Sequence, residues 1–385
     1  MPFYVRQGEL PRVKHTAFRK ADGSLYREEM VSTRGFSGAY TTRYRLNVPS
    51  GAVRQRELAV PRPEPWPEAP VLWSHFKTFE LAQEGDFVGA RAVFLSNESC
   101  SIATARVTRN SETLFRNACA SELVFVHRGQ GVMESEFGAL PFDVGDQLVI
   151  PRATTYRLHF DSLADVRLLI LESRSPFELP AHYRNQAGQL DEGAPFCERD
   201  LRHPVLQPPR DERGEFPVLV KHGDRLFEHV LPSHPFDVAG WDGYLFPWTL
   251  DIKAFHPKVG RIHLPPPVHA VLRTEALVVC DFVPRPYDFH PDAVPAPYYH
   301  SNVDSDEVLY YAGGEFMSRK GVVEGSMTLH PAGMPHGPQP GRVEASIGAA
   351  GTQEYAVMID TFAPLRPTLN VKRTLDAAYA QSWLG

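Results

Sequence analysis

Proline limits the length of helix that this chain can form. The 385 residues include 35 prolines and 28 glycines, scattered without a repeating period. Each proline lacks the amide hydrogen that a helix needs and clashes with the preceding turn. A mainly helical protein is therefore excluded, and so is collagen, which needs glycine at every third position. Short runs rich in Val, Leu, Ile and Phe, such as 122–127, 166–171 and 276–283, predict strands of a sandwich or barrel.

The strand signals fall into two groups, which divides the chain into halves. We expect an N-terminal β domain with an arm over 1–175, a polar, proline-interrupted connecting segment over 176–243, and a C-terminal β domain over 244–385. Apolar side chains near helical spacing in residues 371–383 predict a short C-terminal helix. The expected fold class is all-β, with one helix at the end.

Charge and hydropathy exclude two classes of partner. The 40 basic and 46 acidic residues leave a net charge of −6, so the basic surface of a nucleic-acid-binding protein is not expected. No apolar run approaches the roughly 20 residues that span a bilayer, and the N-terminus has no signal-peptide core. Four widely spaced cysteines without a CxxC pair favour reduced thiols. These features predict a cytoplasmic protein that binds neither nucleic acid nor membrane.

Histidine is concentrated in the C-terminal half, where two segments have the spacing of a known motif pair. Seven of the 16 histidines lie within 256–336. His300-x-Asn302-x4-Glu307-x6-Gly314 resembles the first motif of the cupin barrel, with Asn302 in place of its second histidine. The segment from Gly325 to His336 matches the second motif, Gly-x5-Pro-x-Gly-x2-His. The resemblance predicts a cupin domain, also called a double-stranded β-helix.

The chemistry of the motif residues favours a metal site. Side chains on neighbouring strands converge inside a barrel, so His300, Glu307 and His336 are the expected ligands. Two imidazoles and one carboxylate leave the opposite side of a metal open, which suits Fe(II) enzymes that bind substrate and O2 together. Zinc, manganese and nickel accept the same donors, so the spacing does not name the metal. Asn302 either orients a substrate or satisfies a strand hydrogen bond.

The N-terminal half carries a partial copy of the same motifs. Glu122 occupies the carboxylate position, but Tyr156 stands where the final histidine is needed. The glycines and the proline of the pattern are present as Gly129, Gly145 and Pro151. We therefore expect two cupin-like barrels (a bicupin), of which the first holds no metal and serves packing or assembly.

Four segments resemble the homogentisate 1,2-dioxygenase family. They are Tyr244-Leu-Phe-Pro-Trp-Thr-Leu, Gly260-Arg-Ile-His263, Pro297-Tyr-Tyr-His300-Ser-Asn302 and Pro335-His336-Gly-Pro338. The resemblance is clearest over 240–340. It implies an Fe(II) enzyme that inserts both atoms of O2 into homogentisate to give maleylacetoacetate, in tyrosine and phenylalanine catabolism. It also implies a homo-oligomer, a trimer or hexamer, and it maps the metal ligands onto His300, Glu307 and His336.

The resemblance assigns further roles near the metal. His263 matches the proposed general base of the family, with His269 as the alternative if the loop is built differently. His330 resembles a residue that lines the pocket, although it could instead cap the turn before Pro331. Asn302, Tyr299 and Phe316 complete the expected substrate-binding set.

Phe316 departs from the family pattern. The family has a tyrosine at this position, and the loss of its hydroxyl removes a hydrogen-bond donor that a polar substrate could use. The resemblance makes homogentisate the first expected substrate, and the missing hydroxyl makes gentisate or another hydroquinone the second.

Two other functions are compatible with a bicupin. A metal-dependent isomerase with zinc or manganese would use the same ligands without a base and without O2. A non-catalytic bicupin would use its barrels for packing and would lack ligands in both halves. The C-terminal half retains them, which counts against the second alternative.

Overall fold

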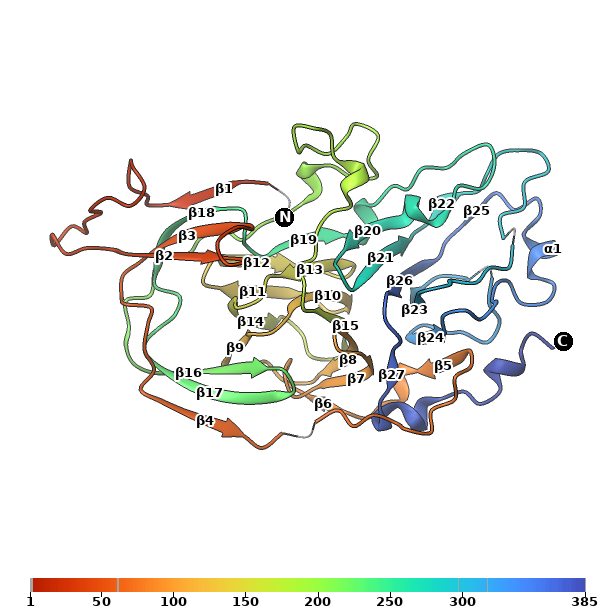
Figure 1. Cartoon of the computed structure of the whole chain (residues 1–385), viewed down its shortest axis with the longest axis horizontal. Coiled ribbons are helices and arrows are strands. Elements are labelled where there is room, and N and C mark those ends of the chain that lie inside the picture. The colour runs from red at the N-terminus through yellow and green to blue at the C-terminus, as the bar shows by residue number, and fades with distance from the viewer. Residues whose placement is uncertain (1–2, 61, 297, 317, 385) are drawn as a thin grey trace.

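The computed structural model describes residues 3–60, 62–296, 298–316 and 318–384, and these residues form two β-barrels with an additional sheet at the N-terminal end (Figure 1). The runs 122–127 and 166–171 lie within β10 (Ser121–Arg128) and β15 (Val166–Ser173), and the run 276–283 contains β21 (Leu277–Phe282). The bicupin fold is thereby confirmed. In the described residues, no helix is long and apolar enough to cross a membrane.

The N-terminal barrel consists of two sheets around an apolar core. The first sheet has the order β19-β13-β10-β15-β8-β7-β27, with β6 paired to β8. Its strands are β6 (Glu84–Gly85), β7 (Arg91–Ser96), β8 (Cys100–Val107), β10 (Ser121–Arg128), β13 (Asp146–Ile150), β15 (Val166–Ser173), β19 (Trp248–Asp251) and β27 (Arg366–Pro367). The second sheet has the order β12-β11-β14-β9-β16-β17-β4. Its strands are β4 (Arg54–Leu58), β9 (Leu114–Asn117), β11 (Gly131–Ser135), β12 (Gly138–Phe142), β14 (Thr155–Phe160), β16 (Arg213–His222) and β17 (Arg225–Ser233). Val124 and Leu148 of the first sheet pack with Met133 and Tyr156 of the second, and all four are buried.

The C-terminal barrel is built on a six-stranded sheet with the order β20-β21-β26-β23-β24-β5. Its strands are β5 (Ser74–Lys77), β20 (Ala270–Arg273), β21 (Leu277–Phe282), β23 (Asp306–Gly313), β24 (Ser326–His330) and β26 (Tyr355–Thr361). A two-stranded ribbon pairs β22 (Arg285–Pro286) with β25 (Gly351–Thr352). Val308 and Val357 of this barrel share one continuous core with Leu169 and Phe125 of the N-terminal barrel.

The remaining elements are a small sheet and short helical turns. The sheet has the order β1-β18-β3-β2, with β1 (Val5–Gly8), β2 (Arg27–Ser32), β3 (Tyr40–Arg45) and β18 (Val238–Gly243). The α-helix α1 spans Arg342–Ser346. The 3₁₀ turns are η1 (Thr78–Glu80), η2 (Ala181–Tyr183), η3 (Glu198–Asp200), η4 (Ile252–Ala254), η5 (Pro266–His269), η6 (Leu369–Thr374) and η7 (Tyr379–Gln381).

The two barrels exchange strands, so the boundaries expected at 175 and 243 do not separate them. β5 lies between β4 and β6 of the N-terminal barrel in sequence but pairs with β24 of the C-terminal barrel. β19 follows residue 243 but pairs with β13. The expected connecting segment contains β16, β17 and β18. The strand β16 has an exposed first half rich in charged residues, which explains why its apolar signal is weak.

The expected C-terminal helix takes the form of two 3₁₀ turns, η6 and η7. Between them Leu375 is extended and forms a bridge with Phe76 of β5, and the amide of Asp376 donates to the carbonyl of His75 at 2.8 Å. Pairing with β5 thus satisfies the backbone groups that a continuous helix would have paired internally.

The motif glycines occupy turns that other residues would strain. Gly314 and Gly325 have φ values of +82° and +80°, a region that disfavours residues with a Cβ atom. A Cβ atom on Gly314 would lie 2.0 Å from the carbonyl oxygen of Gln353. These glycines therefore set the ends of β23 and β24, the strands that carry Glu307 and His330.

Candidate metal centre

Three side chains converge at the end of the C-terminal barrel. Glu307 lies on β23, and His300 and His336 lie on two loops joined by a bridge in which each amide donates to the other carbonyl at 2.8 Å. One ligand atom from each of the three residues lies within 4.8 Å of the others. The spacing in the sequence thus predicted the residues that the tertiary structure brings together.

The nitrogen atoms of this cluster are suited to a metal ion. His336 Nδ1 lies 3.0 Å from the carbonyl oxygen of Met334, which directs Nε2 towards Glu307 Oε2 at 3.3 Å. His300 Nε2 lies 3.4 Å from the same carboxylate oxygen. His336 Nε2 and His300 Nδ1 are buried and have no hydrogen-bond partner among the described residues. Buried imidazole nitrogens without a partner beside a carboxylate fit a divalent cation.

The carboxylate at the centre is held in its charged form. Burial would raise the pKa of Glu307, but the hydrogen bonds from His300 and His330 and the nearby His336 ring outweigh it and hold the pKa well below its usual value. Burial opposes the charged form of His336, yet the Glu307 carboxylate raises its pKa. Metal ligands must be deprotonated, and Glu307 meets this condition at neutral pH.

His330 lies behind Glu307 and is fully buried. It faces Glu307 across β23 and β24, and its Nδ1 lies 2.7 Å from Glu307 Oε1. Its Nε2 lies 3.2 Å from the Tyr379 hydroxyl. Burial lowers the pKa of His330 to about 4, so the ring is neutral. Both nitrogens are therefore engaged within the protein, and the residue supports the carboxylate.

The two candidate bases lie in different surroundings. His263 is one-third exposed, its Nδ1 lies 3.7 Å from Asp288 Oδ2, and burial lowers its pKa. Its ring contacts Tyr298 edge-to-face at 5.3 Å, and Tyr298 contacts the ring of His300 at 6.0 Å. His269 is buried, stacks on Phe282 at 4.6 Å, and has a pKa that burial lowers to about 3.

The expected substrate-binding residues lie on loops around the centre. The carbonyl of Asn302 accepts a 2.7 Å hydrogen bond from the amide of Gly333, and this joins the two motif loops. Tyr299 is 58% exposed. Phe316 packs edge-to-face on Tyr311 with ring centroids 4.5 Å apart. Of these loops, residues 297 and 317 lie outside the described part of the chain.

Three residues near the site escaped the sequence reasoning. Asp288 has no recognisable motif, and only folding brings it to His263. Tyr379 falls within the segment 371–383, for which the sequence predicts a helix, and its hydroxyl contact with His330 carries no signal in the sequence. Asp360 of β26 is the register partner of Glu307, and burial raises its pKa to about 7.

In the N-terminal barrel, an arginine lies beside Glu122, the carboxylate that corresponds to Glu307. The guanidinium of Arg91 donates to Glu122 Oε1 at 2.5 Å and to Glu172 at 2.9 Å, and the Tyr156 hydroxyl donates to Glu122 Oε2 at 2.7 Å. The Arg91 and Glu122 side chains are 9% and 1% exposed. A fixed cation of the protein therefore neutralises the carboxylate that corresponds to Glu307.

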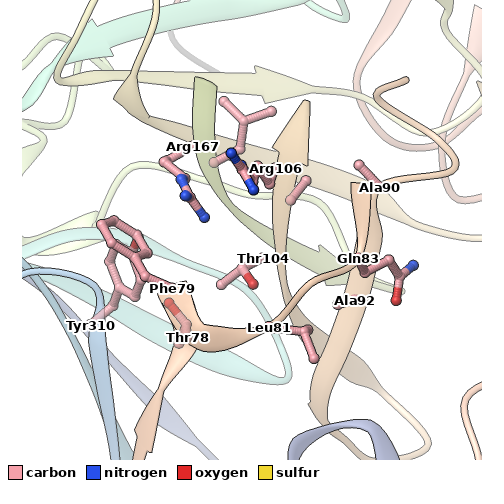
Figure 2. A pocket seen from close by; sticks show the side chains of 12 residues that line it. Thr78, Phe79, Leu81, Gln83, Ala90, Ala92, Thr104, Arg106, Arg167 and Tyr310 are labelled. Atoms are coloured by element: carbon pink, nitrogen blue, oxygen red, sulfur yellow. The ribbon is translucent and has the colours of Figure 1, made fainter. Parts of the chain in front are cut away.

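A small cavity between the barrels is separate from this centre. It has a volume of about 10 Å³, and Thr104, Arg167 and Tyr310 are among the side chains around it (Figure 2). This space is about that of one water molecule. It is too small for an aromatic substrate.

The chain is similar to several known proteins. A family model described as "Homogentisate 1,2-dioxygenase N-terminal" matches residues 71–252. A Saccharolobus solfataricus protein named "Putative dioxygenase" is 40% identical, over 100% of this chain and 99% of its own. The homogentisate 1,2-dioxygenase of Bradyrhizobium diazoefficiens is 29% identical, over 70% of this chain and 62% of its own, so less than two thirds of that enzyme is matched. A cupin 2 conserved barrel domain protein from Leptotrichia buccalis aligns over 71% of this chain and 88% of its own, with 12% identity and a TM-score of 0.30.

Proposed function

The chain belongs to the homogentisate dioxygenase family of the cupin superfamily, and from this membership we propose that it is an Fe(II) enzyme. The proposed reaction cleaves the ring of homogentisate with O2 to give maleylacetoacetate, within tyrosine and phenylalanine catabolism. The observation that carries the proposal is the convergence of His300, Glu307 and His336. Membership of this family by itself identifies the protein as a dioxygenase, and the iron and the substrate are the parts that are proposed.

The three residues would hold the iron through one atom each. Bound Fe(II) would supply Lewis acidity and the electrons for reaction with O2. Three ligand atoms from the protein would leave further positions on the metal for substrate and O2. The exposed aromatic ring of Tyr299 beside this site suits an aromatic substrate.

His263 would act as the general base. A hydroquinone loses a phenolic proton as it binds a metal, and a neutral imidazole can accept it. Burial keeps His263 neutral at pH 7, and Asp288 is placed to stabilise the imidazolium once the proton arrives. His269 lacks this exposure, since it is buried against Phe282.

Oxygen consumption tests the proposal directly. The protein is loaded anaerobically with Fe(II), and O2 uptake and the absorbance of the ring-opened product are followed with homogentisate and, separately, with gentisate. We expect uptake with homogentisate at one O2 per substrate. Uptake with gentisate alone would move the assignment to that hydroquinone, and no uptake with either despite bound iron would exclude the reaction.

A matched pair of variants tests the ligand set. Glu307→Gln keeps the shape of the side chain but removes its charge, and we expect at least about 100-fold weaker Fe(II) binding and no turnover. Glu324→Gln is the control, because Glu324 binds His127 and Arg128 between the barrels and should leave iron binding unchanged. Normal iron binding by Glu307→Gln would remove Glu307 from the ligand set.

A further inference from the structure

A row of hydrogen-bonded side chains links the C-terminal segment to the candidate metal centre. The hydroxyl of Tyr379 lies 3.2 Å from His330 Nε2, and His330 Nδ1 lies 2.7 Å from Glu307 Oε1. An ionised carboxylate only accepts hydrogen bonds, so His330 donates from Nδ1. The neutral ring then accepts at Nε2, and Tyr379 must donate its hydroxyl proton. The direction of the row is therefore from Tyr379 to Glu307.

This row decides which carboxylate oxygen is left for a metal. His330 occupies Oε1 of Glu307, whereas Oε2 lies 3.4 Å from His300 Nε2 and 3.3 Å from His336 Nε2. The carboxylate therefore presents a single oxygen to the space between the two imidazoles. If the His330 ring turned or changed its protonated nitrogen, Glu307 would lose this restraint.

The C-terminal segment that carries Tyr379 is itself anchored beside the centre, near β5 and β24 (Figure 1). Leu375 forms a bridge with Phe76 of β5. The ring of Trp383 packs edge-to-face on Tyr379 at 5.3 Å, and its Nε1 donates to the carbonyl of Gly337 at 3.2 Å. Gly337 follows the ligand His336 directly. The segment thus contacts His330 of β24 and the loop that carries His336.

We propose that Tyr379 is a positioning residue of the metal centre: through His330 it holds Glu307 with Oε2 turned towards His300 and His336. The inference rests on the proposed iron-binding function of these residues. Removing partners that orient metal ligands typically weakens metal binding by about 10–100-fold. Tyr379 acts one step further out than His330, so its effect is expected near the lower end of this range.

Anaerobic Fe(II) affinity, measured by competition with a colorimetric chelator, tests the inference without turnover. Tyr379→Phe removes only the hydroxyl, and we expect its Fe(II) dissociation constant to rise by roughly tenfold. Tyr310→Phe is the matched control. Like Tyr379, Tyr310 is buried and its hydroxyl contacts a histidine, in this case His127 at 2.6 Å. Tyr310 lies on β23, and this contact is at the junction of the two barrels. Thermal melting of the metal-free variants checks that each is folded.

A double-mutant cycle separates positioning from a general loss of packing. His330→Phe keeps a ring in place but breaks the row, so adding Tyr379→Phe to it should cause no further loss of iron affinity. An additive loss, or wild-type affinity in Tyr379→Phe, would overturn the inference while the iron centre stands. If the wild-type protein binds no Fe(II), the proposed function and the inference both fail.

Discussion

Gln147 on β13 and Asp281 on β21 join the two barrels through a buried contact. The Gln147 amide nitrogen donates to both carboxylate oxygens of Asp281, at 2.8 and 2.7 Å. Gln147 Oε1 is buried and has no hydrogen-bond partner among the described residues. Burial raises the pKa of Asp281 from 3.8 to about 8.

The raised pKa of Asp281 predicts a stability that depends on pH. The unfolded chain releases this proton near pH 4, whereas the folded chain keeps it until about pH 8. Between these values the folded state binds more protons, so its stability falls as the pH rises. We expect Asp281→Asn to be more stable than wild type by about 1–3 kcal/mol at pH 8, and the difference to shrink at pH 5. Thermal melts at both pH values measure it.

The control for this prediction is Asp292→Asn, whose side chain is 93% exposed. It should leave the melting temperature unchanged at both pH values. Equal effects of Asp281→Asn at pH 5 and pH 8 would contradict the protonated state of Asp281.

Arg91 predicts a large loss of stability when its charge is removed. Arg91→Met leaves the buried carboxylate of Glu122 without its cation, whereas Glu172 keeps Lys221, and we expect a cost of about 3–5 kcal/mol. Urea denaturation measures the loss. Arg106→Met is the control on the neighbouring strand, because Arg106 pairs with Glu84 at the surface, where such pairs contribute at most about 1 kcal/mol. If both variants lose the same stability, the buried arginine has no special role.

Variants of the two candidate bases, His263 and His269, are expected to show different defects. His263→Gln should bind iron normally but turn over roughly 100-fold or more slowly, since it loses the proton acceptor. His269→Gln should instead lower the melting temperature and retain turnover, because His269 packs on Phe282. Steady-state kinetics of iron-loaded variants tests both. The reverse pattern would make His269 the base.

Phe316 predicts a change in substrate preference. Phe316→Tyr adds a hydroxyl where the resemblance places one, so the ratio of kcat/KM for homogentisate to that for gentisate should rise roughly five- to tenfold, the equivalent of one hydrogen bond. Phe289→Tyr adds the same group to a ring that is 69% exposed and should leave the ratio unchanged. An unchanged ratio in Phe316→Tyr would place its ring outside the substrate's reach.

The candidate ligands were predictable because their spacing is local. His300 and Glu307 are seven residues apart, and the two motifs form adjacent loops and strands, so short-range geometry brings them together. The all-β class followed from the prolines and the strand-like runs for the same reason, since both act over a few residues.

Long-range pairing lay beyond the sequence. Strand β5 joins the C-terminal barrel although its neighbours in sequence, β4 and β6, belong to the N-terminal one, and Tyr379 reaches His330 across 49 residues. Neither contact has a sequence signal, because a strand pairs with whichever edge is free and a buried hydroxyl bonds whichever acceptor folding presents. The sequence alone thus determined the fold class and the donor chemistry of the three candidate ligands. Only the tertiary structure decided which strands close each barrel and which side chains hold the carboxylate in place.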